Sequence, residues 1–207
     1  MKTLAWISIV SSVALAAFMS ACGGGPSTSV TQVWKAPSPP SAPMRSVIVF
    51  AANMTEANRR TAEDIFAGEL AQRGVNAQPS YRMFPGKLPT REEAKAATHR
   101  ANMEGILVIS LKGVRERQTY VPGSYTGDFW GGYYGMGWDT YSPGYVVTDE
   151  IVGVETTLWD PRAQDSLVWS AVTQTTNPET GSEFAKSVAD KVVPQLEQGR
   201  FIPAKQK

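Results

Sequence analysis

The sequence predicts an α/β fold, a single domain with a mixed β-sheet flanked by helices. Strand-like and helix-like segments alternate between residues 46 and 111, which is typical of a β-α-β-α-β unit. Two long runs rich in Val, Thr and Trp follow from residue 145 onward and predict a hairpin, after which a last helical pattern closes the chain. The expected order is therefore β-α-β-α-β-β-β-α, within a domain that spans residues 44–204.

The first strand and helix are marked by composition and by spacing. Residues 46–51 form a continuous β-branched and aromatic run, which indicates a strand that is covered on both faces. Asn53 or Thr55 can then cap a helix that ends before Gly74. Its apolar positions recur at helical spacing and are Ala62, Ile65, Phe66 and Leu70.

The next three elements complete the alternating unit. Residues 75–78 form a short second strand. A capping box at Thr90-Arg91-Glu92-Glu93 opens a second helix, which carries the small side chains Ala94, Ala97 and Ala101 on one side. Residues 105–111 are apolar without alternation, so we expect this third strand to lie in the centre of the sheet.

The closing hairpin and helix follow the same rules. Residues 145–159 and 166–174 are the two hairpin strands, joined by a six-residue turn. A second capping box begins at Thr180, and the helix after it contains Pro194, which we expect to kink or end it. Gly199 closes the element.

The first 21 residues predict a signal peptide. Lys2 is the only charged residue there, and an uncharged run from Leu4 to Phe18 precedes the small pair Ser20-Ala21. This run is too short and too rich in serine for a membrane-spanning helix, which needs ~20 apolar residues. Met19-Ser20-Ala21-Cys22 resembles the lipobox of bacterial lipoproteins, and Cys22 is the only cysteine of the chain. The resemblance implies cleavage before Cys22 and acylation of its sulfur.

We expect the mature chain to be anchored to a membrane by this lipid and to stand away from it on a tether. Residues 22–43 contain five Pro, three Gly and four Ser, a composition typical of a linker. Within it, Val33 and Trp34 either dock on the domain or stay in the linker. In such lipoproteins a glycine at the position of Gly23 implies sorting to the outer membrane, with the domain facing the periplasm.

Composition excludes several classes of function. A net charge of +1 gives no basic excess for a nucleic acid. One cysteine excludes an internal disulfide and a cysteine-rich zinc site, and a single histidine, His99, excludes a multi-histidine metal centre. No phosphate loop or nucleophile elbow is present, so we expect no cofactor and no resident metal.

The segment from Tyr120 to Tyr145, called the aromatic insert below, is the candidate binding site. It holds nine of the chain's 20 aromatic residues and seven glycines, and it contains no Lys or Arg. Its rings can stack on sugars, pack on a protein partner, lie at a lipid interface, or fold back over the sheet as a cover. The residues that we expect to bind are Tyr125, Phe129, Trp130, Tyr133, Tyr134, Trp138 and Tyr141.

Short landmarks along the mature chain resemble a group of uncharacterised bacterial envelope lipoproteins. They are Val33-Trp34-Lys35, Ala77-Gln78-Pro79-Ser80-Tyr81, Tyr120-Val121-Pro122-Gly123 and Leu167-Val168-Trp169-Ser170. At the level of layout the chain is also similar to periplasmic lipoproteins that activate peptidoglycan synthases or help build secretion pores. The resemblance implies no catalytic residue.

Two functions from different classes follow from the sequence. We expect a lipid-anchored envelope protein with a non-enzymatic role, which binds an envelope protein or peptidoglycan. The alternative is a periplasmic glycan hydrolase that would use Asp149, Glu150 or Glu155. Neighbouring strand positions point to opposite faces and residues 149 and 155 are ~20 Å apart on a strand, so these carboxylates cannot form a catalytic pair among themselves.

Overall fold

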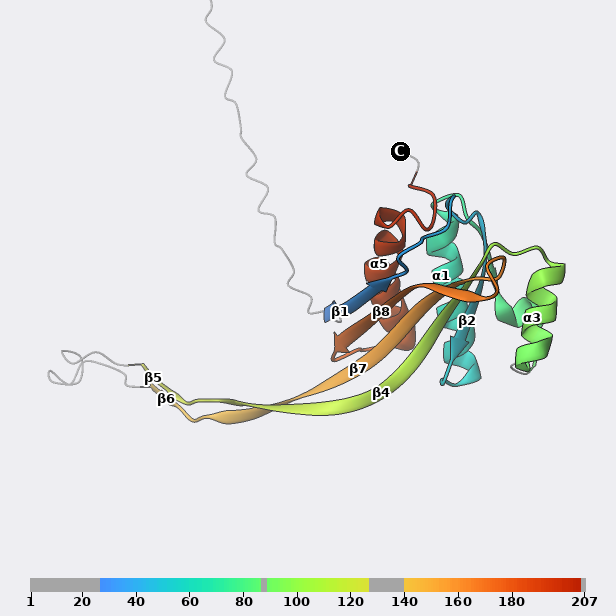
Figure 1. Cartoon of the computed structure of the whole chain (residues 1–207). Helices are drawn as coiled ribbons and strands as arrows, with labels where there is room; N and C mark the ends of the chain where they lie inside the picture. The colour runs from blue at the N-terminus through green and yellow to red at the C-terminus, as the bar shows by residue number, and fades with distance from the viewer. Residues whose placement is uncertain (1–26, 87–88, 127–139, 206–207) are drawn as a thin grey trace, which may run out of the picture.

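The computed structural model describes residues 27–86, 89–126 and 140–205 and confirms the α/β class (Figure 1). Six strands form one sheet in the order β1-β8-β7-β4-β2-β3, and a second sheet has only two strands. The elements are β1 (Ser27–Lys35), β2 (Ser46–Ala52), α1 (Glu56–Ala71), β3 (Asn76–Pro79), α2 (Ser80–Met83), α3 (Arg91–Arg100), β4 (Gly105–Val121), β5 (Ser124–Thr126), β6 (Thr140–Ser142), β7 (Tyr145–Asp160), β8 (Ser166–Thr176) and α5 (Gly181–Gln198).

The six-stranded sheet is mixed, as the sequence predicts. β2 runs parallel to both β3 and β4, which is the product of the two helical crossovers. β4, β7, β8 and β1 pair antiparallel, and the turn between β7 and β8 makes the predicted hairpin. The central strands therefore join the alternating unit to the hairpin.

Helices α1 and α5 cover one face of this sheet and build the core (Figure 1). Val49 of β2 and Ile109 of β4 are buried on neighbouring strands, which confirms the expected burial of both apolar runs. The largest buried apolar side chains come from both layers and include Trp169, Phe66, Leu107, Leu158 and Leu196.

The opposite face of the sheet is only partly covered. Burial alternates along the first residues of β4, so that Leu107 and Ile109 are buried while Ile106 and Val108 are half-buried. The strand is central, as expected, and its second apolar face lies beneath α3, whose Ala94 and Thr98 line a groove over Ile106 and Val108.

The three predicted helix caps are present. The hydroxyls of Thr55, Thr90 and Thr180 each accept a backbone N–H from the first turn, and Glu93 completes the predicted capping box at Thr90. Pro194 does not end α5, which continues to Gln198. The last turn is held because Val193 and Leu196, on either side of the proline, are buried in the core.

The predicted tether is wrong for residues 27–35. These residues form β1, an edge strand that pairs antiparallel with β8 from Ser27↔Thr176 to Lys35↔Trp169. Backbone pairing docks this segment, although the side chains of Val33 and Trp34 stay exposed. The proline-rich residues that follow run over the body, and Met44 is buried there. Only four residues, 23–26, therefore separate Cys22 from the folded body.

β4 and β7 are much longer than the body of the sheet, which the sequence did not predict for β4. Their ladder runs from Ile106↔Trp159 in the body to Val121↔Tyr145 far outside it. Figure 1 shows the two strands leaving the body as a narrow ribbon with β5 and β6 at its far end. We call residues 112–126 and 140–150 the arm. The aromatic insert begins only where the arm has already left the body.

Candidate functional site

The arm leaves the body where its two strands lose their outer neighbours. The last pair between β2 and β4 is Ala52↔Ser110, and the last pair between β7 and β8 is Ile151↔Thr176. Asn177 still forms hydrogen bonds with Glu150 and Asp149 just beyond the second of these pairs, and farther out β4 and β7 pair with no other described strand. A two-stranded ribbon without a covering layer has little stability of its own, so the arm depends on its continuity with the sheet.

A β-bulge marks the root of the arm. The register of β4 shifts between Leu111 and Gly113, and Gly113 lies opposite Gly153. Gly113 has a φ of +151°, which residues with a side chain rarely adopt. Bulges bend a strand and increase its twist, so this site is where the ribbon turns away from the sheet.

Charged residues are concentrated on the first part of the arm. The Lys112 ammonium lies 2.9 Å from the Glu155 carboxylate, and Arg117 lies 2.9 Å from Asp149 across the ladder. The hydrogen bond from Arg117, and then that from Asn177, lowers the pKa of Asp149. This carboxyl group is therefore ionised at neutral pH and cannot act there as a general acid.

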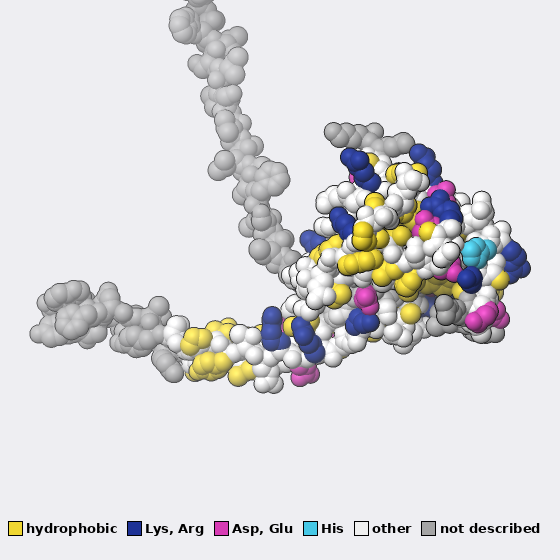
Figure 2. Space-filling view, viewed as in Figure 1, with side chains coloured by type: hydrophobic (Ala, Val, Ile, Leu, Met, Phe, Trp, Pro, Cys, Tyr) yellow, Lys and Arg dark blue, Asp and Glu magenta, His cyan; other side chains and the backbone are white. Residues whose placement is uncertain are grey.

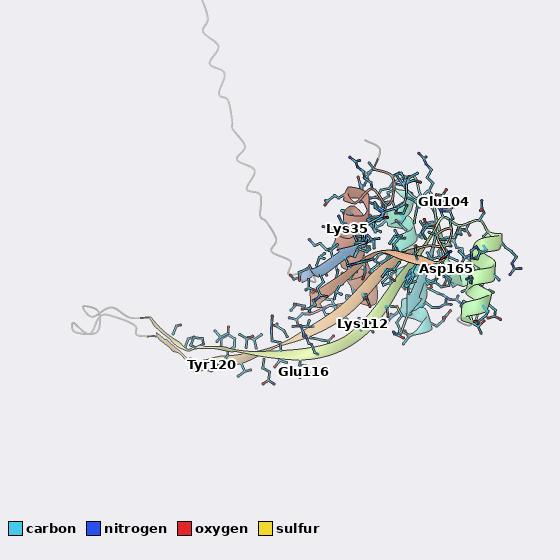
Figure 3. All side chains as sticks on the ribbon, in the orientation of Figure 1. Lys35, Glu104, Lys112, Glu116, Tyr120 and Asp165 are labelled. Atoms are coloured by element: carbon cyan, nitrogen blue, oxygen red, sulfur yellow. The ribbon has the colours of Figure 1, made fainter. Side chains whose placement is uncertain are left out.

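The outer part of the arm carries no charge. Residues 118–126 and 140–148, called the distal ribbon below, contain no Asp, Glu, Lys or Arg. Tyr120 is 66% exposed and Val146 is 57% exposed, although both are large apolar residues. Figure 2 shows this division, with blue and magenta atoms near the body and yellow atoms farther out, and the labels Lys112, Glu116 and Tyr120 follow one another outward in Figure 3.

Two glycines form a narrow neck between the long ladder and the β5–β6 sheet. A Cβ on Gly123 would lie 2.6 Å from the carbonyl oxygen of Ser142, and one on Gly144 would collide with the Tyr120 side chain and lie 2.9 Å from the backbone nitrogen of Gly123. Only glycine fits both contacts. Each follows a proline, and this repeated Pro-Gly pair is the sequence signal that could have located the neck.

The structure brings together two of the seven predicted binding residues. Tyr125 of β5 and Tyr141 of β6 are directly opposite in the ladder between these strands. The other five predicted binding residues, Phe129, Trp130, Tyr133, Tyr134 and Trp138, lie outside the described residues, as does Cys22. The described flanks of the aromatic insert extend away from the sheet and do not cover it.

Of the carboxylates considered for a hydrolase, Asp149 and Glu150 lie on the arm, whereas Glu155 lies in the body, where it pairs with Lys112 and lines a cavity beside β1. Glu150 lies opposite Glu116 in the ladder, a neighbour that sequence reasoning missed, while Asp149 lies opposite Arg117. Glu116 and Glu150 are both exposed, and neither lines any of the four cavities described for the folded part. Neither of these two carboxylates therefore lies in a described cavity that could enclose a substrate.

A large hollow among the described residues lies between α3 and the open face of the sheet. This groove has a volume of about 500 Å³ and is lined mainly by apolar side chains, including Phe50, Ile106, Val108 and Trp159. At its rim Lys95 pairs with Asp165 at 2.7 Å, and His99 lies 3.6 Å from the same carboxylate. His99 is exposed, and Asp165 at this rim is labelled in Figure 3. The groove therefore offers an apolar surface for packing and, at its rim, one ion pair.

A buried charged cluster ties α1 to the sheet. Glu63 accepts hydrogen bonds from the Ser80 hydroxyl at 2.7 Å, the Tyr81 N–H at 3.0 Å and the Ala51 N–H at 3.1 Å. Arg59, also buried, lies 3.5 Å from the same carboxylate and donates to Ser80. Its members satisfy one another and are closed to solvent, so we assign the cluster a structural role.

Neither a metal site nor a spanning helix is found in the described ranges. No group of three metal-binding side chains occurs among these residues. Their helices include none that is both long and apolar enough to cross a membrane.

No family model and no curated protein matches this sequence. Among solved structures, a PelC dodecamer from Paraburkholderia phytofirmans is similar at 17% identity over 86% of this chain and 99% of that chain, with a TM-score of 0.48. The lipoprotein GNA1162 from Neisseria meningitidis is similar at 11% identity over 74% and 98%, with a TM-score of 0.40.

A minor lipoprotein from Acinetobacter baumannii is similar at 10% identity over 80% of this chain and 99% of that chain, with a TM-score of 0.37. Two of these three proteins are thus bacterial lipoproteins by name. Each likeness concerns the course of the backbone, so function is derived below from this chain's own residues.

Replacing Glu63 by Ala should lower the free energy of unfolding by about 3 to 5 kcal/mol, because the Ser80 hydroxyl and the Tyr81 and Ala51 N–H groups lose their acceptor. Arg59 keeps its closer ion pair with Glu56 at 2.7 Å. Glu63→Gln, which keeps an acceptor oxygen, should cost less. The neighbouring exposed carboxylate offers a control, and Asp64→Ala should change the value by no more than about 1 kcal/mol. Urea unfolding measures all three, and equal effects of Glu63→Ala and Asp64→Ala would contradict the structural role.

Proposed function

We propose that this protein is a lipid-anchored, non-enzymatic protein of the bacterial cell envelope that works by contact through its arm. The observation that carries the proposal is the arm itself, a ribbon that leaves the body and has no second layer to pack on. A body that served only its own stability would have no use for such an extension. The expected partner is an envelope protein or peptidoglycan.

The anchor follows from the sequence and from the position of β1. The signal peptide and lipobox assign a diacylated cysteine at Cys22, and more than one acyl chain holds a protein stably on a membrane. Gly23 favours the outer membrane, with the domain in the periplasm. Five residues, 22–26, then lead directly into the edge of the sheet. The body is therefore held close to the bilayer that carries the lipid.

The contact is assigned to the aromatic insert at the end of the arm. Aromatic side chains dominate contact energies because they bury a large area at low entropic cost. This insert holds nine of them on a glycine-rich backbone. Its flanks face solvent on a scaffold that projects from the body, which is the placement that a binding element requires. No observation on the described residues favours the glycan hydrolase, and we do not propose it.

The anchor predicts a defined covalent product. Wild-type protein from membranes should lack residues 1–21 and carry acyl mass on Cys22, and Cys22→Ala should abolish both the cleavage before residue 22 and the acyl mass. Mass spectrometry of intact protein measures this directly. A soluble mature protein with a free Cys22 thiol would contradict the proposed anchor.

If the aromatic insert makes the contact, its removal should reduce binding to the envelope without changing the stability of the body. Replacing residues 125–141 by a short Gly-Ser link should leave the thermal midpoint within about 2 °C, because no part of the core is removed. In the mature chain from residue 22 onward with Cys22→Ala, which has neither signal peptide nor lipid, the same change should lower retention on sedimented envelope material.

Two results would sink this assignment. Unfolding of the body in the linked variant would make the aromatic insert part of the fold. Undiminished retention in the Cys22→Ala background would place the contact elsewhere on the molecule.

A further inference from the structure

We propose that the distal ribbon, residues 118–126 and 140–148, lies in the interfacial layer of the same membrane that holds the Cys22 lipid. The inference rests on the proposed anchor and adds a second, weaker membrane contact to it. The ligand is a lipid surface, which the distal ribbon contacts in addition to the partner proposed for the aromatic insert, and the two segments overlap at residues 120–126 and 140–145.

The register of the sheet places the anchor and the root of the arm at the same end of the molecule. Ser27, the first residue of β1, pairs with Thr176 of β8, and Thr176 pairs in turn with Ile151 of β7. Ile151 faces Arg115 of β4, which lies three residues beyond Lys112, the first residue of the arm. With strands about 4.8 Å apart, Ser27 is about 10 Å from the arm.

The lengths agree with this placement. From Cys22 to Ser27 the chain takes five steps, so Ser27 can be no more than about 17 Å from the acylated residue. The arm continues for 11 residues from Arg115 to Thr126, which spans about 36 Å when extended. Residues 22–27 and the two strand spacings together hold the arm's root at most about 27 Å from the acylated residue. The arm, at about 36 Å, is longer than this distance and can therefore reach the bilayer.

The side chains change outward along the arm from charged to uncharged, which is the order expected for a segment that enters a membrane interface. The part near the body carries Lys112, Arg115, Glu116, Arg117, Asp149 and Glu150. Outward from these the distal ribbon has no charge, and it exposes tyrosine, valine and threonine. Tyrosine has an apolar ring and a polar hydroxyl, the combination that is enriched where hydrocarbon meets headgroups.

The backbone limits the depth of this contact. Both outer edges of the distal ribbon lack a paired strand, so their N–H and C=O groups need water or headgroups as partners. Pro122 and Pro143 remove two of the donors. A ribbon of this kind can lie in the interfacial layer, whereas burial in hydrocarbon would leave its edge groups without partners.

Two valines provide a matched test. Val146 in the distal ribbon and Val114 in the charged part are each 57% exposed. Residue 146 lies opposite Tyr120, and Val114 lies on the same face of β4 as Tyr120, six residues away. Glutamate at either site is exposed and should leave the melting temperature unchanged. The two variants differ in their distance from the proposed lipid contact.

The experiment uses the mature chain from residue 22 onward with Cys22→Ala, which lacks both the apolar signal peptide and the lipid, and vesicles of phosphatidylethanolamine and phosphatidylglycerol in a 3:1 ratio. The Cys22→Ala chain should sediment with the vesicles, Val146→Glu should lower the partition coefficient at least tenfold, and Val114→Glu should leave it within twofold. Circular dichroism checks that each variant is folded.

The other results overturn the inference. Absence of the Cys22→Ala chain from the vesicle pellet would do so, and so would equal losses for the two glutamate variants. Sedimentation with purified peptidoglycan but not with vesicles would contradict the lipid contact while leaving the proposed function intact. An unacylated wild-type Cys22 would instead remove the proposed anchor.

Discussion

The β4–β7 ladder is the constraint on which both the body and the arm depend. Its inner half lies at the centre of the six-stranded sheet, where Leu107 and Leu158 face each other in the core. Its outer half pairs with no other described strand, so the inner half sets its register. A strand that slips by one residue moves its whole apolar set to the other face, so the buried pairs also fix which side chains the arm presents.

The buried cluster around Glu63 secures the opposite edge of the same sheet. β2 loses its neighbour β3 after Val49↔Pro79, and the Glu63 carboxylate then accepts the Ala51 N–H that β3 no longer reaches. The same carboxylate binds the Ser80 hydroxyl and the Tyr81 N–H, so it connects α1 to the chain that follows β3. At one side of the sheet the Glu63 carboxylate accepts an N–H that no described strand pairs with, and at the other side β1 pairs with the edge of β8.

Local sequence patterns were sufficient to predict the helices and strands of the body, but not β1 or the outer half of β4. Runs such as 46–51 and 105–111, and the caps at Thr55, Thr90 and Thr180, predicted elements that the structure confirms, because burial and capping leave a local record. β1 has exposed side chains on most of its length, and it exists because β8 offers an unpaired edge. The outer half of β4 is exposed at nearly every position, so no apolar periodicity could reveal it. Both depend on pairing between distant residues.

The central claim is that one continuous ladder is part of the body at one end and unsupported at the other. Amide hydrogen exchange along β4, in solution without lipid, tests this most directly. The amides of residues 105–111 that bond within the sheet should exchange only with the free energy of global unfolding, while those of residues 114–121 that bond to β7 should exchange through local opening at a much lower free energy. Equal protection along the whole of β4 would show that the arm is supported by contacts that this account does not contain.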